Sequence, residues 1–102
     1  MAQFDVYHFS SSGSGPLFVV DLQSDLLDGL ATRIVAPLYQ VQESAKPILR
    51  LNPLVQIDGK LYYLCIQEIA AMRVKTLGEK VGSLTEQRAE IIGALDLLIT
   101  GV

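Results

Sequence analysis

Residues 54–66, LVQIDGKLYYLCI, carry the clearest local signal in the chain, because two apolar runs flank the pair Asp58-Gly59. Asp-Gly is favoured at the two positive-φ positions of a type I′ turn, whose twist matches that of paired antiparallel strands. The stretch therefore predicts a β-hairpin with strands at residues 54–57 and 60–66.

Three further strands are predicted on the N-terminal side of this hairpin, at residues 4–9, 17–22 and 33–40, where β-branched and aromatic residues gather. The turn-forming residues 10–16, SSSGSGP, predict a loop between the first two strands. Residues 25–32 are expected to form a short irregular excursion, and residues 41–53 a loop. Pro37 lies inside the third predicted strand, and because proline has no N–H it demands an edge strand or a bulge.

The C-terminal part predicts one more short strand, from residues 74–77 and 80–81 around Gly78, and then a helix. Ser83 and Glu86 have the spacing of a capping box at a helix start. Leu97 falls on the opposite face of this helix, near Asp96 and Thr100. Seven residues at helical spacing predict a stripe that faces the core: Leu84, Arg88, Ile91, Ile92, Leu95, Leu98 and Ile99.

Together these elements predict a mainly β fold with a C-terminal α-helix, arranged as a small twisted antiparallel sheet or partly open barrel. The chain of 102 residues suits one domain over residues 1–102, because half of it is apolar and only 19% is charged.

The distribution of charge argues against direct nucleic-acid binding. Asp5, Asp21, Asp25 and Asp28 all precede the first basic residue, Arg33, and the net charge is −3. A protein that binds DNA or RNA needs lysines and arginines to displace phosphate counterions.

The chain lacks an apolar run of about 20 residues, the length that spans a bilayer. The N-terminus does not have the basic and apolar regions of a signal segment, and the single cysteine cannot form an internal disulfide. We therefore expect a cytoplasmic protein without a membrane span.

The inventory of reactive residues favours a binding role over an enzyme. His8 is the only histidine and lies on a predicted apolar strand, and Cys65 lies in an apolar run where a cysteine is usually a small buried residue. Asp21, Asp25 and Asp28 have irregular spacing and are expected to be solvated acids or turn caps. We therefore predict no catalytic residue, no metal site and no cofactor.

Several motifs match a known family over most of the chain. They are Gln3-Phe4 with Val6-Tyr7, Phe18-Val19 with Asp21, Gln23-Ser24-Asp25 followed by two aliphatic residues and Asp28, Arg33 with Val35 and Pro37-Leu38, Pro53 with Val55 and Ile57, and the closing Gly101-Val102. In this set the chain resembles the CcdB-type toxins of bacterial toxin–antitoxin modules.

The resemblance implies a homodimer of SH3-like barrel subunits that traps the A subunit of DNA gyrase in its cleaved-DNA state. It also implies a cognate antitoxin whose disordered C-terminal segment neutralises the toxin. Thr100 stands where a known family member has tryptophan, and Asp96 where an asparagine is expected. Matched residue by residue, the gyrase-binding positions become Leu26, Leu27, Asp96, Thr100, Gly101 and Val102.

Two other functions remain open at this point. Messenger-RNA interferases share the same fold, but such an enzyme would need a basic groove and a general base. A paralogue that titrates antitoxin without poisoning a target is the third possibility.

Overall fold

The computed structural model describes residues 2–9, 15–41 and 46–101. Parts of the two predicted loops, residues 10–14 and 42–45, therefore lie outside the described residues, as does Val102. The described residues form seven strands, four single-turn 3₁₀ helices and one α-helix: β1 (Asp5–His8), β2 (Phe18–Asp21), η1 (Asp25–Leu27), β3 (Thr32–Gln40), β4 (Leu54–Ile57), β5 (Lys60–Leu64), η2 (Ile66–Glu68), β6 (Ala70–Arg73), η3 (Val74–Thr76), β7 (Lys80–Ser83), η4 (Thr85–Gln87) and α1 (Arg88–Thr100).

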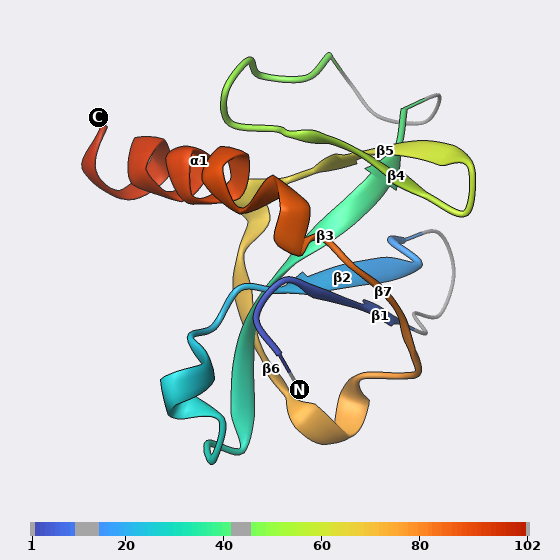
Figure 1. Cartoon of the computed structure of the whole chain (residues 1–102), viewed down its shortest axis with the longest axis vertical. Coiled ribbons are helices and arrows are strands. Elements are labelled where there is room, and N and C mark those ends of the chain that lie inside the picture. The colour runs from blue at the N-terminus through green and yellow to red at the C-terminus, as the bar shows by residue number, and fades with distance from the viewer. Residues whose placement is uncertain (1, 10–14, 42–45, 102) are drawn as a thin grey trace.

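All strand pairs are antiparallel, in the order β4-β5-β3-β2-β1-β7, and β6 pairs with β3. Figure 1 shows the sheet curled into a half-barrel, with α1 beside it and the C-terminal end of α1 projecting outward. The predicted fold class, mainly β with one C-terminal helix, is confirmed.

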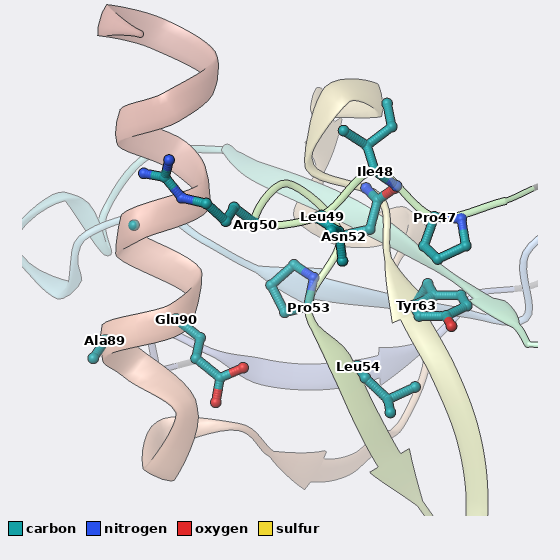
Figure 2. Close-up of a pocket in the computed structure, with 11 residues that line it drawn as sticks. Pro47, Ile48, Leu49, Arg50, Asn52, Pro53, Leu54, Tyr63, Ala89 and Glu90 are labelled. Carbon is teal, nitrogen blue, oxygen red and sulfur yellow. The ribbon is translucent and has the colours of Figure 1, made fainter. Parts of the chain in front are cut away.

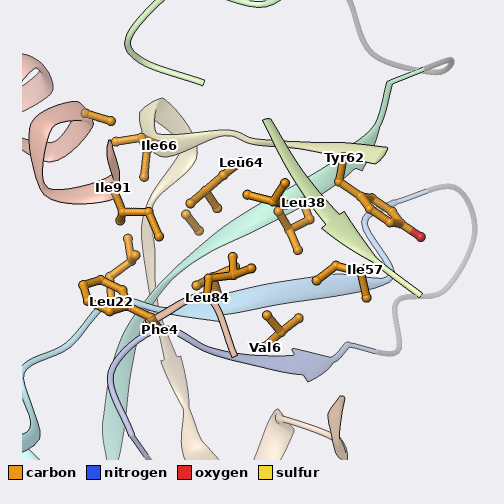
Figure 3. Packing of buried hydrophobic residues seen from close by; sticks show 14 residues of the cluster. Phe4, Val6, Leu22, Leu38, Ile57, Tyr62, Leu64, Ile66, Leu84 and Ile91 are labelled. Carbon is orange, nitrogen blue, oxygen red and sulfur yellow. The ribbon is translucent and has the colours of Figure 1, made fainter. Parts of the chain in front are cut away.

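The core fills the concave side of the curled sheet (Figure 3). Val6, Val20, Leu38 and Leu64 from four neighbouring strands are buried there, and Ile91 contributes from α1. Because side chains alternate between the two faces of a strand, the inward residues recur at every second position. Tyr7, Val19 and Val35 form a smaller cluster with Phe9, Met72 and Leu77.

The predicted hairpin is confirmed in its strands and its turn. Ile57 pairs with Lys60 across the connection, and Asp58 and Gly59 both have positive φ, 49° and 78°. These are the two positions that a type I′ turn requires. The second strand ends at Leu64, because the chain turns into η2 at Ile66.

The prediction that Pro37 marks an edge strand or bulge is wrong. β3 is the central strand, and Pro37 pairs with Val19 on one side. On the other side β3 changes partner, from β6 up to Val35 to β5 from Leu38 onward. Pro37 lies in that gap, where its carbonyl accepts a hydrogen bond from the Cys65 N–H at 2.9 Å. A missing N–H is tolerated there because no strand faces it.

The C-terminal segments differ from the prediction in two places. Residues 70–73 form the strand β6, which the sequence did not indicate, whereas residues 74–76 form η3 rather than a strand. The strand around Lys80-Val81 is confirmed as β7. The capping box is absent, because Ser83 ends β7, its hydroxyl accepts from the Thr85 N–H at 3.3 Å, and α1 begins only at Arg88 after η4.

The stripe of α1 that faces the core is narrower than predicted. Leu84 and Ile91 are buried, and Ile92, Leu95 and Leu98 are partly buried against the core. Arg88 instead lies at the surface over the Phe4 ring, 5.7 Å from its centroid, and Ile99 is 69% exposed. Ala94, which the prediction did not include, is fully buried.

Candidate protein-binding site

The six predicted gyrase-binding positions fall into two groups. Leu26 and Leu27 belong to η1, which leaves the sheet between β2 and β3, and their exposed fractions are 94% and 50%. Asp96, Thr100 and Gly101 are exposed at the end of α1, and Val102 lies outside the described residues. Figure 1 shows η1 and the end of α1 in separate parts of the molecule, so a single chain does not bring the two groups together.

The end of α1 is an ordered helix cap. Gly101 adopts a left-handed conformation at φ 76°, and its N–H donates to the carbonyls of Asp96 and Leu97 at 3.1 Å each. The Thr100 hydroxyl also donates to the Asp96 carbonyl, at 2.8 Å. A left-handed glycine is the common way to end a helix. Leu97, predicted on the opposite face, is half-buried.

A buried ion pair lies at the base of η1. Arg33 and Asp21 have no exposed side-chain surface, and the Arg33 Nη2 and Nε donate to Asp21 Oδ2 at 2.6 and 2.9 Å. Arg33 Nη1 donates to Asp28 Oδ1 at 3.1 Å, and the Asp28 side chain is half-exposed. Burial acts to lower the pKa of Arg33, but the hydrogen bond and charge of Asp21 outweigh it and raise that pKa.

Asp21, Asp25 and Asp28 were expected to be solvated acids or turn caps. Asp21 is not solvated, because its side chain is fully buried, but its Oδ1 accepts from the Gln23 N–H two residues later at 3.0 Å, as a turn cap does. Asp25 accepts a hydrogen bond from the Gln3 N–H at 2.7 Å. Asp5, outside that prediction, is buried and pairs with Lys80 at 3.3 Å. Arg33 gave a sequence signal for the ion pair, because a charged residue inside an apolar strand has to be paired when it is buried.

A groove of about 550 Å³ lies between α1 and the segment that leads into β4 (Figure 2). Ala89, Glu90 and Gly93 line it on the helix side. On the other side it is lined by Pro47, Ile48, Leu49, Arg50, Asn52, Pro53, Leu54 and Tyr63.

The buried Asn52 holds that segment in place. Its Oδ1 accepts from the Ile48 N–H at 2.9 Å, and its Nδ2 donates to Gln67 Oε1 at 2.7 Å and to the Leu64 carbonyl at 3.3 Å. Leu49 is 86% exposed at the rim of the groove. This groove was not predicted from the sequence, although Ile48, Leu49 and Leu51 between two prolines were a visible signal.

The family model described as CcdB protein matches residues 3–101. The chain belongs to the CcdB family. A solved structure, described as an endoribonuclease in complex with its cognate antitoxin from Mycobacterial species, is similar with a TM-score of 0.79. It shares 12% sequence identity and aligns over 97% of this chain and 94% of that chain, which shows a common fold.

The two reactive residues of this CcdB-family protein that the sequence singles out, Cys65 and His8, lie in different settings. Cys65 is buried, and burial, with a smaller effect from the Glu68 charge, raises the pKa of its thiol to about 11. His8 is an exposed strand residue whose ring packs against that of Phe18 in a T-shaped arrangement, with a centroid distance of 5.5 Å.

Within the described residues, no group of three or more His, Cys, Asp or Glu side chains could hold a metal ion. No helix in that part of the chain is long and apolar enough to cross a membrane.

Proposed function

We propose that this CcdB-family toxin of a toxin–antitoxin module binds the A subunit of DNA gyrase in the cytoplasm and traps the cleaved-DNA complex. It acts by protein contact rather than as an enzyme. The observation that carries the proposal is the exposure of Leu26, a residue that is 94% exposed on a turn whose following residue, Asp28, contacts the buried Arg33–Asp21 pair. An exposed apolar residue on a segment tied to the fold by hydrogen bonds is a suitable anchor for a protein interface.

The experiment compares variants at both groups of proposed contacts. A Leu26→Ala/Leu27→Ala double variant and a deletion of residues 100–102 should both lose growth arrest and the accumulation of cleaved DNA by purified gyrase. The double variant should keep a wild-type unfolding curve, because Leu26 and Leu27 are exposed or half-exposed. The deletion also removes the Gly101 cap, so it should lower stability slightly without changing the fold, because Thr100 and Gly101 lie beyond the α1 residues that pack against the core. The control is Leu61→Ala on β5, where the leucine is 48% exposed. A truncated chain that still traps gyrase would contradict the proposal.

The proposed partners are a second copy of the chain and a cognate antitoxin with a disordered C-terminal segment. Membership of the CcdB family supports the homodimer, and exposed apolar residues such as Ile99 and Leu49 are available to be covered in it. Sedimentation at micromolar concentration should give about twice 11.1 kDa, and a single-chain mass would overturn this part of the proposal. Co-expression of the proposed cognate antitoxin should restore growth.

A second candidate is favoured by one specific observation, the structural similarity to a protein described as an endoribonuclease. Against it, the first basic residue, Arg33, is wholly buried and paired with Asp21, so it is not available for a phosphate contact. Cleavage of single-stranded RNA by the purified protein, or growth arrest in a gyrase-resistant host, would favour this candidate. A paralogue that only titrates antitoxin would arrest growth in neither host.

A further inference from the structure

The η1 segment keeps its conformation without apolar burial. None of the three residues of η1 is buried, and Leu26, Leu27 and Leu30 are each at least half-exposed. Its own backbone hydrogen bonds close single turns, such as that from the Leu27 N–H to the Ser24 carbonyl at 3.0 Å. Fixing each backbone residue costs about 1–2 kcal/mol in entropy. Other contacts must therefore hold this segment.

Asp25 of η1 accepts from the Gln3 N–H at an exposed position, and the side chain of Gln23 supplies a buried set of contacts. Its Nε2 donates to the carbonyls of Leu27 at 3.2 Å and Thr32 at 3.3 Å. Its Oε1 accepts from the Ile34 N–H at 3.1 Å. The carboxamide therefore uses both donor hydrogens and its acceptor, and Gln23 itself is buried. One side chain thus fastens the end of η1 to the first residues of β3.

A second attachment follows η1 directly. Asp28 accepts from Arg33 Nη1 at 3.1 Å, and Arg33 is itself fixed to Asp21. The Asp28 side chain is 56% exposed, so solvent screens this ion pair. The buried carboxamide of Gln23 is therefore expected to be the stronger attachment.

We propose that Gln23 is a positioning residue for the gyrase contact, because its carboxamide fixes η1 in the conformation that presents Leu26 and Leu27. This inference rests on the proposed function. A contact segment that is ordered before binding loses less conformational entropy in the complex, so its affinity is higher. Gln23 does not have to touch gyrase to have this effect.

The test replaces Gln23 by methionine, which has a similar length but cannot make the three hydrogen bonds. In Gln23→Met, backbone ¹⁵N order parameters of residues 25–30 should fall from about 0.85 to below about 0.6. The affinity for the isolated gyrase A subunit should fall at least about tenfold, because ordering η1 then opposes binding. The control Val55→Ala removes buried atoms from β4, outside η1. It should lower stability yet leave affinity within about twofold, because effects at distant sites are independent.

Each outcome decides a different part of the inference. Unchanged order parameters in Gln23→Met overturn the positioning role, and so does an affinity loss no larger than that of Val55→Ala. Wild-type protein that does not bind gyrase overturns the proposed function instead, and with it the role of Gln23 in gyrase binding. If Gln23→Met does not fold, Asp28→Ala removes the exposed attachment and should shift both readouts in the same direction by less. If neither the order parameters nor the affinity change in Asp28→Ala, the inference is overturned.

Discussion

Arg33 and Asp21 are the pair of residues on which the base of η1 depends. Both side chains are wholly buried, and two nitrogens of the guanidinium donate to one carboxylate oxygen. The other oxygen of Asp21 accepts from the Gln23 N–H at 3.0 Å. Burial of a charge is tolerated only when its partners satisfy it. We therefore attribute the order of this region to completed hydrogen bonding rather than to the ion pair alone.

Breaking this pair from one side should be strongly destabilising. Arg33→Met should lower the free energy of unfolding in urea by about 3–5 kcal/mol, because it leaves the Asp21 carboxylate buried without its partner. Adding Asp21→Asn should restore part of that loss, because a neutral amide is less costly to bury unpaired. A double variant whose loss equals the sum of the two single losses would show that the pair is not coupled.

At the scale of single elements, two glycines make a matched pair for testing backbone conformation. A Cβ added at Gly93 in α1 or at Gly59 in the hairpin turn meets nothing within 4 Å, but Gly59 has φ +78°. Gly93→Ala should therefore stabilise by about 0.5–1 kcal/mol through helix propensity. Gly59→Ala should destabilise by about 1–2 kcal/mol, because the left-handed conformation is strained for alanine. Urea denaturation of both variants checks the opposite signs, and equal signs would contradict the argument.

Elements were predictable where the local signal and the tertiary structure agree. The Asp58-Gly59 turn depends only on two adjacent residues, so its strands and turn type were readable from the sequence. β6 was missed because its residues Ala70 to Arg73 have little β-propensity, and they form a strand only because β3 offers a partner. Pro37 was misplaced for a related reason, since the change of partner along β3 is not a local property.

At the scale of the whole molecule, the candidate site was predictable only as a set of positions. The motif resemblance gave Leu26 and Leu27, and the structure shows them exposed on η1. These two leucines lie apart from the end of α1 because of the way the sheet curls (Figure 1). The curl of the sheet cannot be predicted from a local sequence pattern. The predicted burial of Ile99 failed similarly, because α1 extends beyond the core that it packs against.

The stability of the folded chain should fall in alkaline solution. Burial is the main cause that raises the pKa of the Cys65 thiol from 9.0 to about 11. It also raises the pKa values of Tyr7 and Tyr39 from 10.0 to about 12, with added effects from Asp5 on Tyr7 and Glu68 on Tyr39. These groups carry no charge when protonated, so the folded state keeps protons that the unfolded chain releases.

The sign of the effect follows from this difference in proton binding. As pH rises above about 9, the unfolded chain loses the Cys65 proton first, so the free energy of unfolding decreases until the folded thiol ionises near 11. The tyrosines extend the decrease from about 10 to about 12. Urea midpoints measured from pH 7 to 12 should therefore be level at first and then fall from about pH 9. In Cys65→Ala the fall should begin about one pH unit later, where the tyrosines start to ionise. An unchanged onset in that variant would show that the thiol is not protected by burial.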